Sequence, residues 1–518
     1  MLLHEPFDFH GLSRPDSDFA ICDGQRLSYG QAKTRSERMS AALHAAGVGE
    51  GGRFGVLMRN APDFLLILLA ASRVGAVPVP LNYRLAPREW VDLMVDAGAT
   101  LIIADPEFAE AFDTIPVSAG LKRLCATGRA RGWTPLEDAL TAVAATPPAV
   151  TVSSADIAFQ MYTSGTTGRA KGALISQRAI VSNLIQSNLA APHKLSPGER
   201  ALLVLPLFHV AAMVTALGAA CSGACLVIHR DVDPTAIARA LAEDEIVLAI
   251  FVPAVIQFLL VGVPGLDRMR FPHLKALGYG ASPIAEPVLR RALEVFDCHI
   301  YQGFGMTELA GGCTNLSEAD HRRAVAGRPD LLLSAGRALP GCEIQIVGPD
   351  DEPLPAGVTG ELIVRGEILM SGYWNMPEAT TEALRGGWLH TGDAGYLDAE
   401  GYLFIRDRIK DMIVSGAENV YPAEVEGVLY KHPAVAEAAV IGVPDARWGE
   451  MVMAVIVAKP DAAVTQDQLD VFCRDHLGGF KVPRRYEFLS ALPRNASGKI
   501  LKRELREQYW SGHDRRVS

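Results

Sequence analysis

A stretch of eleven residues, YTSGTTGRAKG at positions 162–172, concentrates glycines, hydroxyls and a lysine directly after an apolar run at 157–162. Its glycines adopt positive φ readily and let a ligand approach the backbone amides, its hydroxyls donate hydrogen bonds, and its lysine adds a positive charge. The residues that would make these contacts are Thr163, Ser164, Gly165, Thr166, Thr167, Gly168 and Lys171. Together they suit a polyphosphate, although a flexible connector has a similar composition.

The order of residues in this stretch differs from that of a Walker loop. A Walker loop places lysine and then Ser or Thr directly after its last glycine. Here Lys171 lies three residues after Gly168 and is followed by Gly172. The stretch therefore disfavours an ordinary P-loop kinase or GTPase.

Four further segments carry polar residues at distinctive spacing. They are YQGFGMTE at 301–308, TGD at 391–393, DRIKDMIVSGAENVYPAEVE at 407–426 and PRNASGKILKREL at 493–505. With the stretch at 162–172, they resemble in order and spacing the motifs of the adenylate-forming superfamily of acyl-CoA synthetases, luciferases and peptide-synthetase adenylation domains. The resemblance covers essentially the whole chain. It implies an acid–thiol ligase that uses ATP, Mg²⁺ and coenzyme A: a carboxylate attacks the α-phosphate to give an acyl-adenylate and pyrophosphate, and a thiol then displaces AMP.

The resemblance also implies which residues bind the nucleotide. Phe304 would stack on adenine, Gln302 would bond its edge, and Thr307 would contact the α-phosphate. Glu308 would bind Mg²⁺, for which a carboxylate oxygen is a suitable hard ligand. The other positions that match the family's nucleotide site are Gly280, Ala281, Ser282, Gly303, Asp393 and Arg408, the last two at the ribose hydroxyls. The stretch at 162–172 would hold the β- and γ-phosphates.

Further matches imply how the two half-reactions are separated. Lys499 resembles the C-terminal lysine that lies against the substrate carboxylate and the bridging oxygen of ATP in the first half-reaction, the formation of the adenylate. Lys410 matches the hinge about which the C-terminal domain rotates, and His209 resembles the residue that gates the acyl channel. After rotation, a tunnel for the pantetheine arm would be lined by Ser415, Gly416, Ala417 and Glu418. Many relatives have two consecutive glycines where this chain has Gly416 and Ala417.

The segments that would line the acyl pocket are small and apolar. They contribute Val210, Ala211, Ala212, Met213, Tyr279, Gly280, Ala281, Gly303, Met306, Gly311 and Gly312. No Arg or Lys among them would neutralise a second carboxylate, so malonate-like diacids are disfavoured. The sequence favours a medium- or long-chain fatty acid, because the segment at 409–426 looks most like bacterial fatty-acyl-CoA ligases. An aryl acid of the cinnamate, ferulate or benzoate kind is the alternative.

Other functional classes stay open at this point. A stand-alone adenylation enzyme that loads a carrier protein would perform the first half identically, although the short run of chain after Lys499 favours a free-standing CoA ligase. A luciferase-like oxygenase would use the same adenylate. A non-catalytic nucleotide sensor would be expected to lack Glu308 or Lys499, and both are present.

The elements that must position these residues alternate along the chain. Short apolar runs separated by helix-length segments predict an α/β fold with two mostly parallel sheets covered by helices. We expect an N-terminal adenylate-forming domain at 1–409, with a small β-rich subdomain from about 334, and a mobile α+β domain at 410–518. The pattern at 29–46 predicts a helix capped by Ser28. The uncharged stretch 210–228 predicts a buried helix followed by a buried strand instead of a membrane span.

Composition and charge limit the compartment and the partners. The 518 residues are 49% hydrophobic and 21% charged, which is typical of a large globular protein with two or more domains. A net charge of −10 argues against a nucleic-acid partner. Eight cysteines without a CxxC pair and an amino terminus unlike a secretory signal predict a reducing compartment, the cytoplasm. A homodimer and a peripheral membrane contact of the basic cluster at 474–516 are left open.

Overall fold

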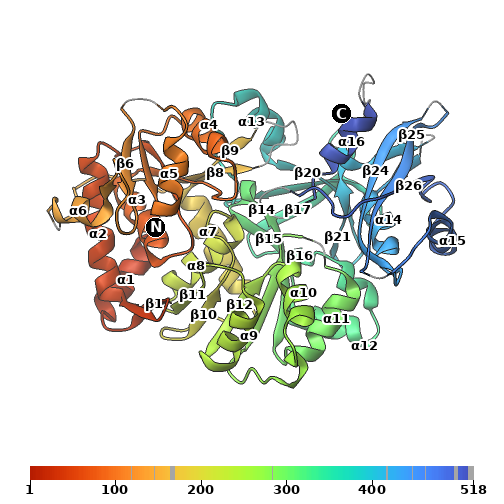
Figure 1. Ribbon diagram of the computed structural model, residues 1–518, viewed down its shortest axis with the longest axis horizontal. Coiled ribbons are helices and arrows are strands. Elements are labelled where there is room, and N and C mark those ends of the chain that lie inside the picture. The colour runs from red at the N-terminus through yellow and green to blue at the C-terminus, as the bar shows by residue number, and fades with distance from the viewer. Residues whose placement is uncertain are drawn as a thin grey trace. The chain divides into compact units, whose positions relative to one another are not determined.

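The computed structural model describes residues 1–117, 120–144, 146–163, 170–282, 284–415, 418–445, 447–460, 462–494 and 500–510 (Figure 1). By packing, the chain divides into two units, Met1–Ile344 with Val364–Leu389 and Gln345–Ile363 with His390–Ser518. This division groups residues by their contacts, whereas the predicted boundary at 409–410 concerns a rotation. The domains 1–409 and 410–518, with a hinge at Lys410, therefore stay a prediction.

The largest sheet of the first unit has the order β16-β15-β14-β13-β12-β10-β11-β1-β2. Its strands are β1 (Asp18–Cys22), β2 (Gln25–Ser28), β10 (Arg200–Leu203), β11 (Cys225–Ile228), β12 (Ile246–Phe251), β13 (Ala276–Gly280), β14 (His299–Met306), β15 (Gly311–Leu316) and β16 (Arg337–Ala338). The strands from β14 to β1 pair in parallel, and β2, β15 and β16 add antiparallel edges. The carboxyl ends of the parallel strands meet at one edge, where ligands bind in open α/β sheets.

Helices cover this sheet, as expected for parallel strands that are buried on both faces. They are α7 (Gln177–Ala190), α8 (Val210–Cys221), α9 (Pro234–Glu243), α10 (Pro253–Gly262), α11 (Glu286–Val295) and α12 (Glu318–Ala326), with short 3₁₀ turns η1 (Leu266–Arg268), η2 (Thr307–Leu309) and η3 (Pro329–Leu333). Helix α8 packs on β10 and β11, α9 and α10 pack on β12, and α12 packs on β14. Helix α8 and strand β11 are both buried, which confirms the prediction for 210–228.

A second parallel sheet of the first unit has the order β4-β3-β5-β6-β7. Its strands are β3 (Arg53–Leu57), β4 (Val77–Pro80), β5 (Leu101–Ala104), β6 (Lys122–Cys125) and β7 (Thr134–Pro135), and the helices of this region are α1 (Glu5–Ser13), α2 (Tyr29–Ala45), α3 (Pro62–Val74), α4 (Pro87–Ala97), α5 (Pro106–Asp113) and α6 (Leu136–Thr141). Helix α2 begins at a capping box formed by Ser28 and Gln31, as the pattern at 29–46 predicts.

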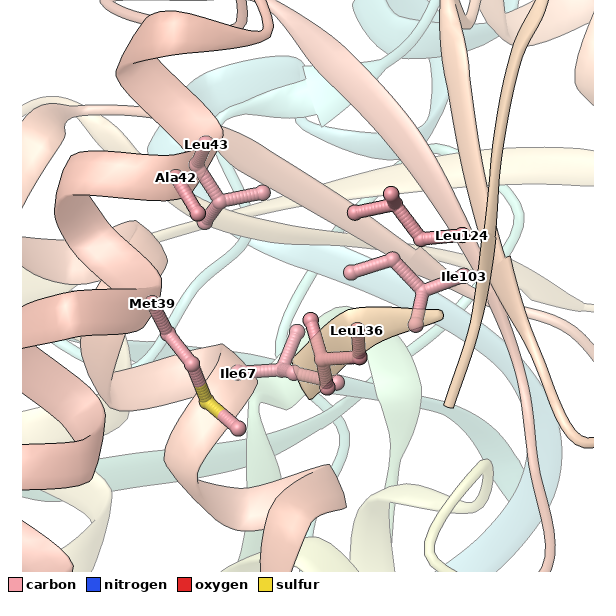
Figure 2. Close-up of a pocket in the computed structure, with 7 residues that line it drawn as sticks. All are labelled: Met39, Ala42, Leu43, Ile67, Ile103, Leu124 and Leu136. Carbon is pink, nitrogen blue, oxygen red and sulfur yellow. The ribbon is translucent and has the colours of Figure 1, made fainter. Parts of the chain in front are cut away.

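The core beside this second sheet is closely packed. Figure 2 shows the side chains around a cavity of about 10 Å³, contributed by α2, α3, β5, β6 and α6. The seven residues are Met39, Ala42, Leu43, Ile67, Ile103, Leu124 and Leu136. A void of this size holds one water at most, and its apolar walls offer that water no hydrogen bond. We therefore expect it to be empty.

A three-stranded antiparallel sheet, in the order β19-β9-β8, completes the sheets of the first unit that the structure describes in full. Its strands are β8 (Ile157–Thr163), β9 (Lys171–Ser176) and β19 (Gly372–Tyr373), and helix α13 (Pro377–Ala383) and the turn η4 (Arg385–Gly387) follow β19 in the chain. The sheet brings the stretch at 162–172 beside a segment two hundred residues later in the sequence.

The second unit contains two sheets. Most of the sheet β17-β18-β20-β21 belongs to it, with strands β17 (Cys342–Val347), β18 (Gly360–Gly366), β20 (Leu389–Leu397) and β21 (Leu403–Arg408). A further sheet has the order β23-β22-β25-β24 with β26 on β25, and its elements are η5 (Ile409–Asp411), β22 (Ile413–Ser415), β23 (Glu418–Val420), α14 (Pro422–Leu429), β24 (Val435–Asp445), β25 (Gly449–Ala458), α15 (Gln466–His476), β26 (Arg485–Phe488) and α16 (Lys502–Trp510). Helices α14 and α15 enclose an apolar core against this sheet. In the two sheets, β20–β21, β22–β23, β22–β25 and β24–β25 pair antiparallel and β26 pairs parallel with β25.

Neither a membrane span nor a thiolate site is found among the described residues. Their helices include none that is both long and apolar enough to cross a bilayer. The eight cysteines are free, and burial raises the pKa of Cys221 and Cys225 to about 12. At neutral pH both are protonated thiols, which are poor metal ligands.

Candidate active site

Strands β8 and β9 hold the two ends of the stretch at 162–172. They pair antiparallel with Thr163 opposite Lys171, so the chain leaves and re-enters the sheet at neighbouring positions. Ser164, Gly165, Thr166, Thr167 and Gly168 lie outside the described residues, and their contact with phosphate stays a prediction. The structure thus shows the anchors of this loop, one hydroxyl residue and one lysine side by side.

A chain of hydrogen bonds fixes the base of the loop. The Tyr162 hydroxyl donates to Asp96 (2.6 Å) and accepts from the Gln160 amide (3.0 Å), whose oxygen accepts from Arg53 (2.8 Å). The Arg53 guanidinium in turn lies 3.4 Å from the centre of the Trp374 ring. Burial first, and then the bond to Asp96, raise the pKa of Tyr162, so the phenol is a neutral donor. These partners hold β8 rigidly where the loop begins.

Glu308 is a buried carboxylate that Tyr373 links to Lys171 at the end of this stretch. It lies in η2, directly after β14, and is only 6% exposed. Its Oε1 accepts a hydrogen bond from the Tyr373 hydroxyl (2.9 Å), and the Tyr373 ring lies 4.9 Å from the Lys171 ammonium. Among the residues that the structure describes, the bond from Tyr373 to Oε1 is the one hydrogen bond to this carboxylate, which leaves Oε2 for a further ligand. A buried carboxylate with one open oxygen fits Mg²⁺, which binds through one or two carboxylates together with substrate phosphates.

Strand β14 carries the residues expected at adenine. Gln302 lies opposite Tyr279, and its buried Oε1 has no partner among the described residues, so it is ready to accept from an amine. Gly303 pairs with Gly280, where an added Cβ would lie 2.3 Å from the Gly303 carbonyl oxygen. Ala281 has φ +66°, a strained left-handed conformation that is common at ligand sites. Ser282 follows it and is exposed.

A mostly apolar cavity of about 240 Å³ adjoins these strands. Of the residues expected at the nucleotide and the acid, those that line it are Val210, Ala211, Tyr279, Gly280, Ala281, Gly303, Phe304, Gly311 and Gly312. Met306 lies outside its lining, and Ala212 and Met213 are fully buried elsewhere in the fold. None of the described lining residues is Lys or Arg, which agrees with a neutral tail on the ligand.

Helix α8 presents one face to this cavity. The lining positions are Val210, Ala211, Val214, Thr215, Gly218 and Ala219, which recur every three to four residues, and Ser222, which directly follows the helix. From Val210 to Ser222 this face extends for about 18 Å at 1.5 Å per residue. Helix α7 contributes a second such stripe, Leu184, Ser187 and Asn188, and Ala191 directly after the helix continues it. The sequence did not reveal which face of either helix would line the pocket.

Two histidines near the cavity are neutral. His209 precedes α8, and burial, helped by the charge of Arg84, lowers its pKa to about 4. His321 was not expected from the sequence: burial lowers its pKa, its Nδ1 donates to the Ser317 carbonyl (2.8 Å), and its Nε2 accepts from the Tyr279 hydroxyl (3.0 Å). The Tyr279 hydroxyl is thereby satisfied. The gating role of His209 stays a prediction.

In the second unit, Asp393 and Arg408 lie opposite each other on β20 and β21. Asp393 is 4% exposed, and its Oδ1 accepts from Arg408 Nε at 2.6 Å. The same guanidinium donates to the Thr391 carbonyl (3.1 Å), so the pair is fixed in orientation. A rigid, oriented carboxylate is suited to accept from the two hydroxyls of a ribose.

The remaining candidates also belong to the second unit. Lys410 lies in η5, and Ser415 pairs with Glu418 across the hairpin of β22 and β23. Gly416, Ala417 and Lys499 lie outside the described residues. Their proposed parts in thioester formation and in adenylation therefore rest on the sequence.

Comparison with known proteins matches the chain along most of its length. Residues 7–374 match the family model described as AMP-binding enzyme, and residues 424–499 match that of the AMP-binding enzyme C-terminal domain. Among solved structures, o-succinylbenzoate coenzyme A synthetase (MenE) from Bacillus subtilis, in complex with ATP and magnesium ion, is similar with a TM-score of 0.84 at 28% identity. That likeness covers 96% of this chain and 98% of that one.

Curated relatives of similar identity differ in their named substrates. Feruloyl-CoA synthase from Amycolatopsis sp is 38% identical over 94% of this chain and 94% of its own length. Fatty acid–[acyl-carrier-protein] ligase ScoC from Streptomyces coeruleorubidus is 36% identical, covering 98% and 97%. Long-chain-fatty-acid–CoA ligase FadD13 from Mycobacterium tuberculosis is also 36% identical, covering 93% of each chain. Identity alone therefore does not select the acid.

Proposed function

The chain belongs to the family of AMP-binding enzymes, and on that premise we propose that it activates a hydrophobic monocarboxylic acid with ATP and transfers the acyl group to coenzyme A. As an acid–thiol ligase it forms AMP and pyrophosphate and requires ATP and Mg²⁺. One observation carries the proposal: Gly303 and Phe304 of β14 line the apolar cavity, Gln302 of the same strand has a buried oxygen without a partner among the described residues, and the buried Glu308 follows directly in η2. A single strand and turn would thus hold acid and nucleotide together.

The chain's own groups position the reactants and neutralise charge, which are the main contributions to phosphoryl displacement. Lys171 and the hydroxyls beside it would bind the β- and γ-phosphates, and Gln302 would accept from the adenine amine. Glu308 would hold the Mg²⁺ ion, which supplies charge neutralisation at the phosphates. Asp393 would accept from the ribose hydroxyls. Tyr373 contacts Lys171 and Glu308 without any ligand, so little rearrangement of these two groups would be needed in the transition state.

We propose a medium- or long-chain fatty acid as the substrate. The lining of the cavity, which contains no Lys, Arg, Asp or Glu among the described residues, and its extent of about 18 Å from Val210 to Ser222 support this choice. The resemblance to a feruloyl-CoA synthase supports an aryl acid as the second candidate, and the resemblance to ScoC supports a carrier-protein thiol as a second acceptor.

We place the reaction in the cytoplasm; a homodimer and a peripheral membrane contact stay predictions.

Gly218 offers a test of the acid and its length. It lies on the cavity face of α8, and a Cβ added there would meet only Leu184 Cδ2, at 3.9 Å. From Val210 to Gly218 the helix advances about 12 Å. An extended chain advances roughly 1.2 Å per bond, so about ten carbons would reach this point. The variant Gly218→Met should therefore accept acids up to about ten carbons and reject longer ones.

The measurement is pyrophosphate release with ATP, Mg²⁺ and CoA across a panel from acetate through long-chain fatty acids to cinnamates, benzoates and malonate. We expect the wild-type enzyme to release pyrophosphate fastest with fatty acids longer than ten carbons. Gly218→Met should lower the rate with these acids at least tenfold and leave the rates with shorter acids unchanged. Gly262→Met, on a different helix with open space around it, is the control. A maximum among aryl acids would replace the proposed substrate, and turnover without CoA would point to another thiol.

A further inference from the structure

Tyr373 occupies a fixed place beside the strand that begins with Lys171. It belongs to β19, which pairs antiparallel with β9 so that Tyr373 lies opposite Ala173. On either side of it, Ser371 N–H donates to the Leu174 carbonyl and Trp374 N–H donates to the Gly172 carbonyl, both at 2.8 Å. The backbone at Tyr373 therefore moves only if the sheet does.

The same short segment also holds Glu308. Met370 N–H donates to the backbone carbonyl of Glu308 at 2.8 Å, and the Tyr373 hydroxyl donates to the Glu308 carboxylate at 2.9 Å. Glu308 is thus held by hydrogen bonds to its main chain and to its side chain, both from residues more than sixty positions later in the sequence. Hydrogen bonds to an ionised carboxylate are stronger than those between neutral groups.

A second contact joins Tyr373 to Lys171, the first residue of β9. The Lys171 ammonium lies 4.9 Å from the centre of the Tyr373 ring, within the range of a cation–π interaction. The ring restrains the ammonium without taking any of its three hydrogen-bond donors, which stay available for phosphate. Tyr373 therefore contacts the cation and the anion of the candidate site at once, through its ring and its hydroxyl.

We propose that Tyr373 is the positioning residue that sets Lys171 and Glu308 for one polyphosphate–metal group. Its hydroxyl occupies Oε1 of Glu308 and leaves Oε2 for the metal ion, and its ring keeps Lys171 beside that carboxylate. This role rests on the proposed function of the two charged residues. It adds a residue that none of the five sequence motifs contains, and it explains how charges separated by 137 positions share a fixed geometry before any ligand binds.

Two substitutions separate the hydroxyl from the ring. Tyr373→Phe keeps the ring below Lys171 and removes the hydrogen bond to Glu308, whereas Tyr373→Leu removes both contacts. Calorimetric titration of ATP, without acid, would measure affinity at increasing Mg²⁺ concentration. For Tyr373→Phe we expect the Mg²⁺ concentration for half-maximal binding to rise about tenfold, the upper range for one hydrogen bond, with little change in metal-free ATP affinity. Tyr373→Leu should also weaken metal-free ATP binding, about threefold.

Tyr29→Phe is the matched control, because that tyrosine is fully buried in the same unit and its hydroxyl donates to two backbone carbonyls away from the site. The proposal would be overturned if Tyr373→Phe bound ATP with the wild-type requirement for Mg²⁺. It would also be overturned if Tyr29→Phe raised the half-maximal Mg²⁺ concentration as much as Tyr373→Phe does. Conversion of supplied acyl-adenylate and CoA to thioester should stay near wild type in every variant. If wild-type ATP binding does not depend on Mg²⁺ at all, the proposed function itself fails, and the role of Tyr373 fails with it.

Discussion

Replacing Glu308 with glutamine is expected to slow adenylate formation on the order of a thousandfold. Glutamine keeps the shape of the side chain and an oxygen that accepts from the Tyr373 hydroxyl, so the buried site should stay folded. It loses the negative charge, and its amide nitrogen cannot serve as an oxygen ligand for Mg²⁺. The loss therefore falls on the step in which the charged polyphosphate must be neutralised.

The measurement is ATP–pyrophosphate exchange, compared with thioester formation from supplied acyl-adenylate and CoA. The rate of exchange should fall on the order of a thousandfold in Glu308→Gln. The rate of thioester formation, which involves no polyphosphate, should stay within a few-fold of wild type. Glu343→Gln, at an exposed acid that pairs with Arg365 in the same unit, should change neither rate. An exchange rate within threefold of wild type in Glu308→Gln would remove this residue from the metal site.

Replacing Lys499 with alanine is expected to suppress exchange by a factor of 10² to 10³, the effect of losing one group that stabilises developing charge. The motif PRNASGKILKREL gives the reason, since its lysine resembles the one placed against the reacting carboxylate. Conversion of supplied acyl-adenylate should continue, because the domain rotation would have withdrawn this lysine by then. Lys459→Ala, at an exposed lysine of the second unit, is the control. Equal loss of both half-reactions would contradict the assignment.

The variant Gly416→Leu should show the reverse pattern. If residues 415–419 line a tunnel for the pantetheine arm, a bulky side chain there blocks thioester formation and leaves exchange intact. The two variants would then divide the reaction between two segments of the C-terminal region. Loss of exchange in Gly416→Leu would instead indicate a structural role for the loop.

Local signals in the sequence predicted several elements correctly. The helix after Ser28 could be predicted because its capping residue and its apolar stripe lie within one segment. The helix and strand at 210–228 could be predicted because small apolar residues without charge suit a buried position better than a bilayer. The mostly parallel sheets followed from the alternation of apolar runs with helix-length segments, and the observed topology confirms them.

The contacts that set the candidate site could not be predicted in the same way. The bond from Tyr373 to Glu308 depends on the pairing of β19 with β9, which joins segments about 200 residues apart and has no local signature. The same holds for Arg53, which reaches Gln160 across 107 positions. Met213 was expected at the acyl pocket, but the face of α8 that lines the cavity includes Gly218 and Ala219 and not Met213. Which face of a helix meets a cavity depends on its tertiary neighbours.

The most direct test of the central claim follows the oxygen atoms of the acid. In the proposed reaction a carboxylate oxygen attacks the α-phosphorus and pyrophosphate leaves; the thiol then attacks the carbonyl carbon, and that oxygen departs with AMP. With acid labelled by ¹⁸O in both carboxylate oxygens, mass spectrometry should find one ¹⁸O in AMP, one in the acyl-CoA and none in pyrophosphate. Unlabelled AMP, or label in inorganic phosphate formed together with ADP, would contradict activation through an acyl-adenylate.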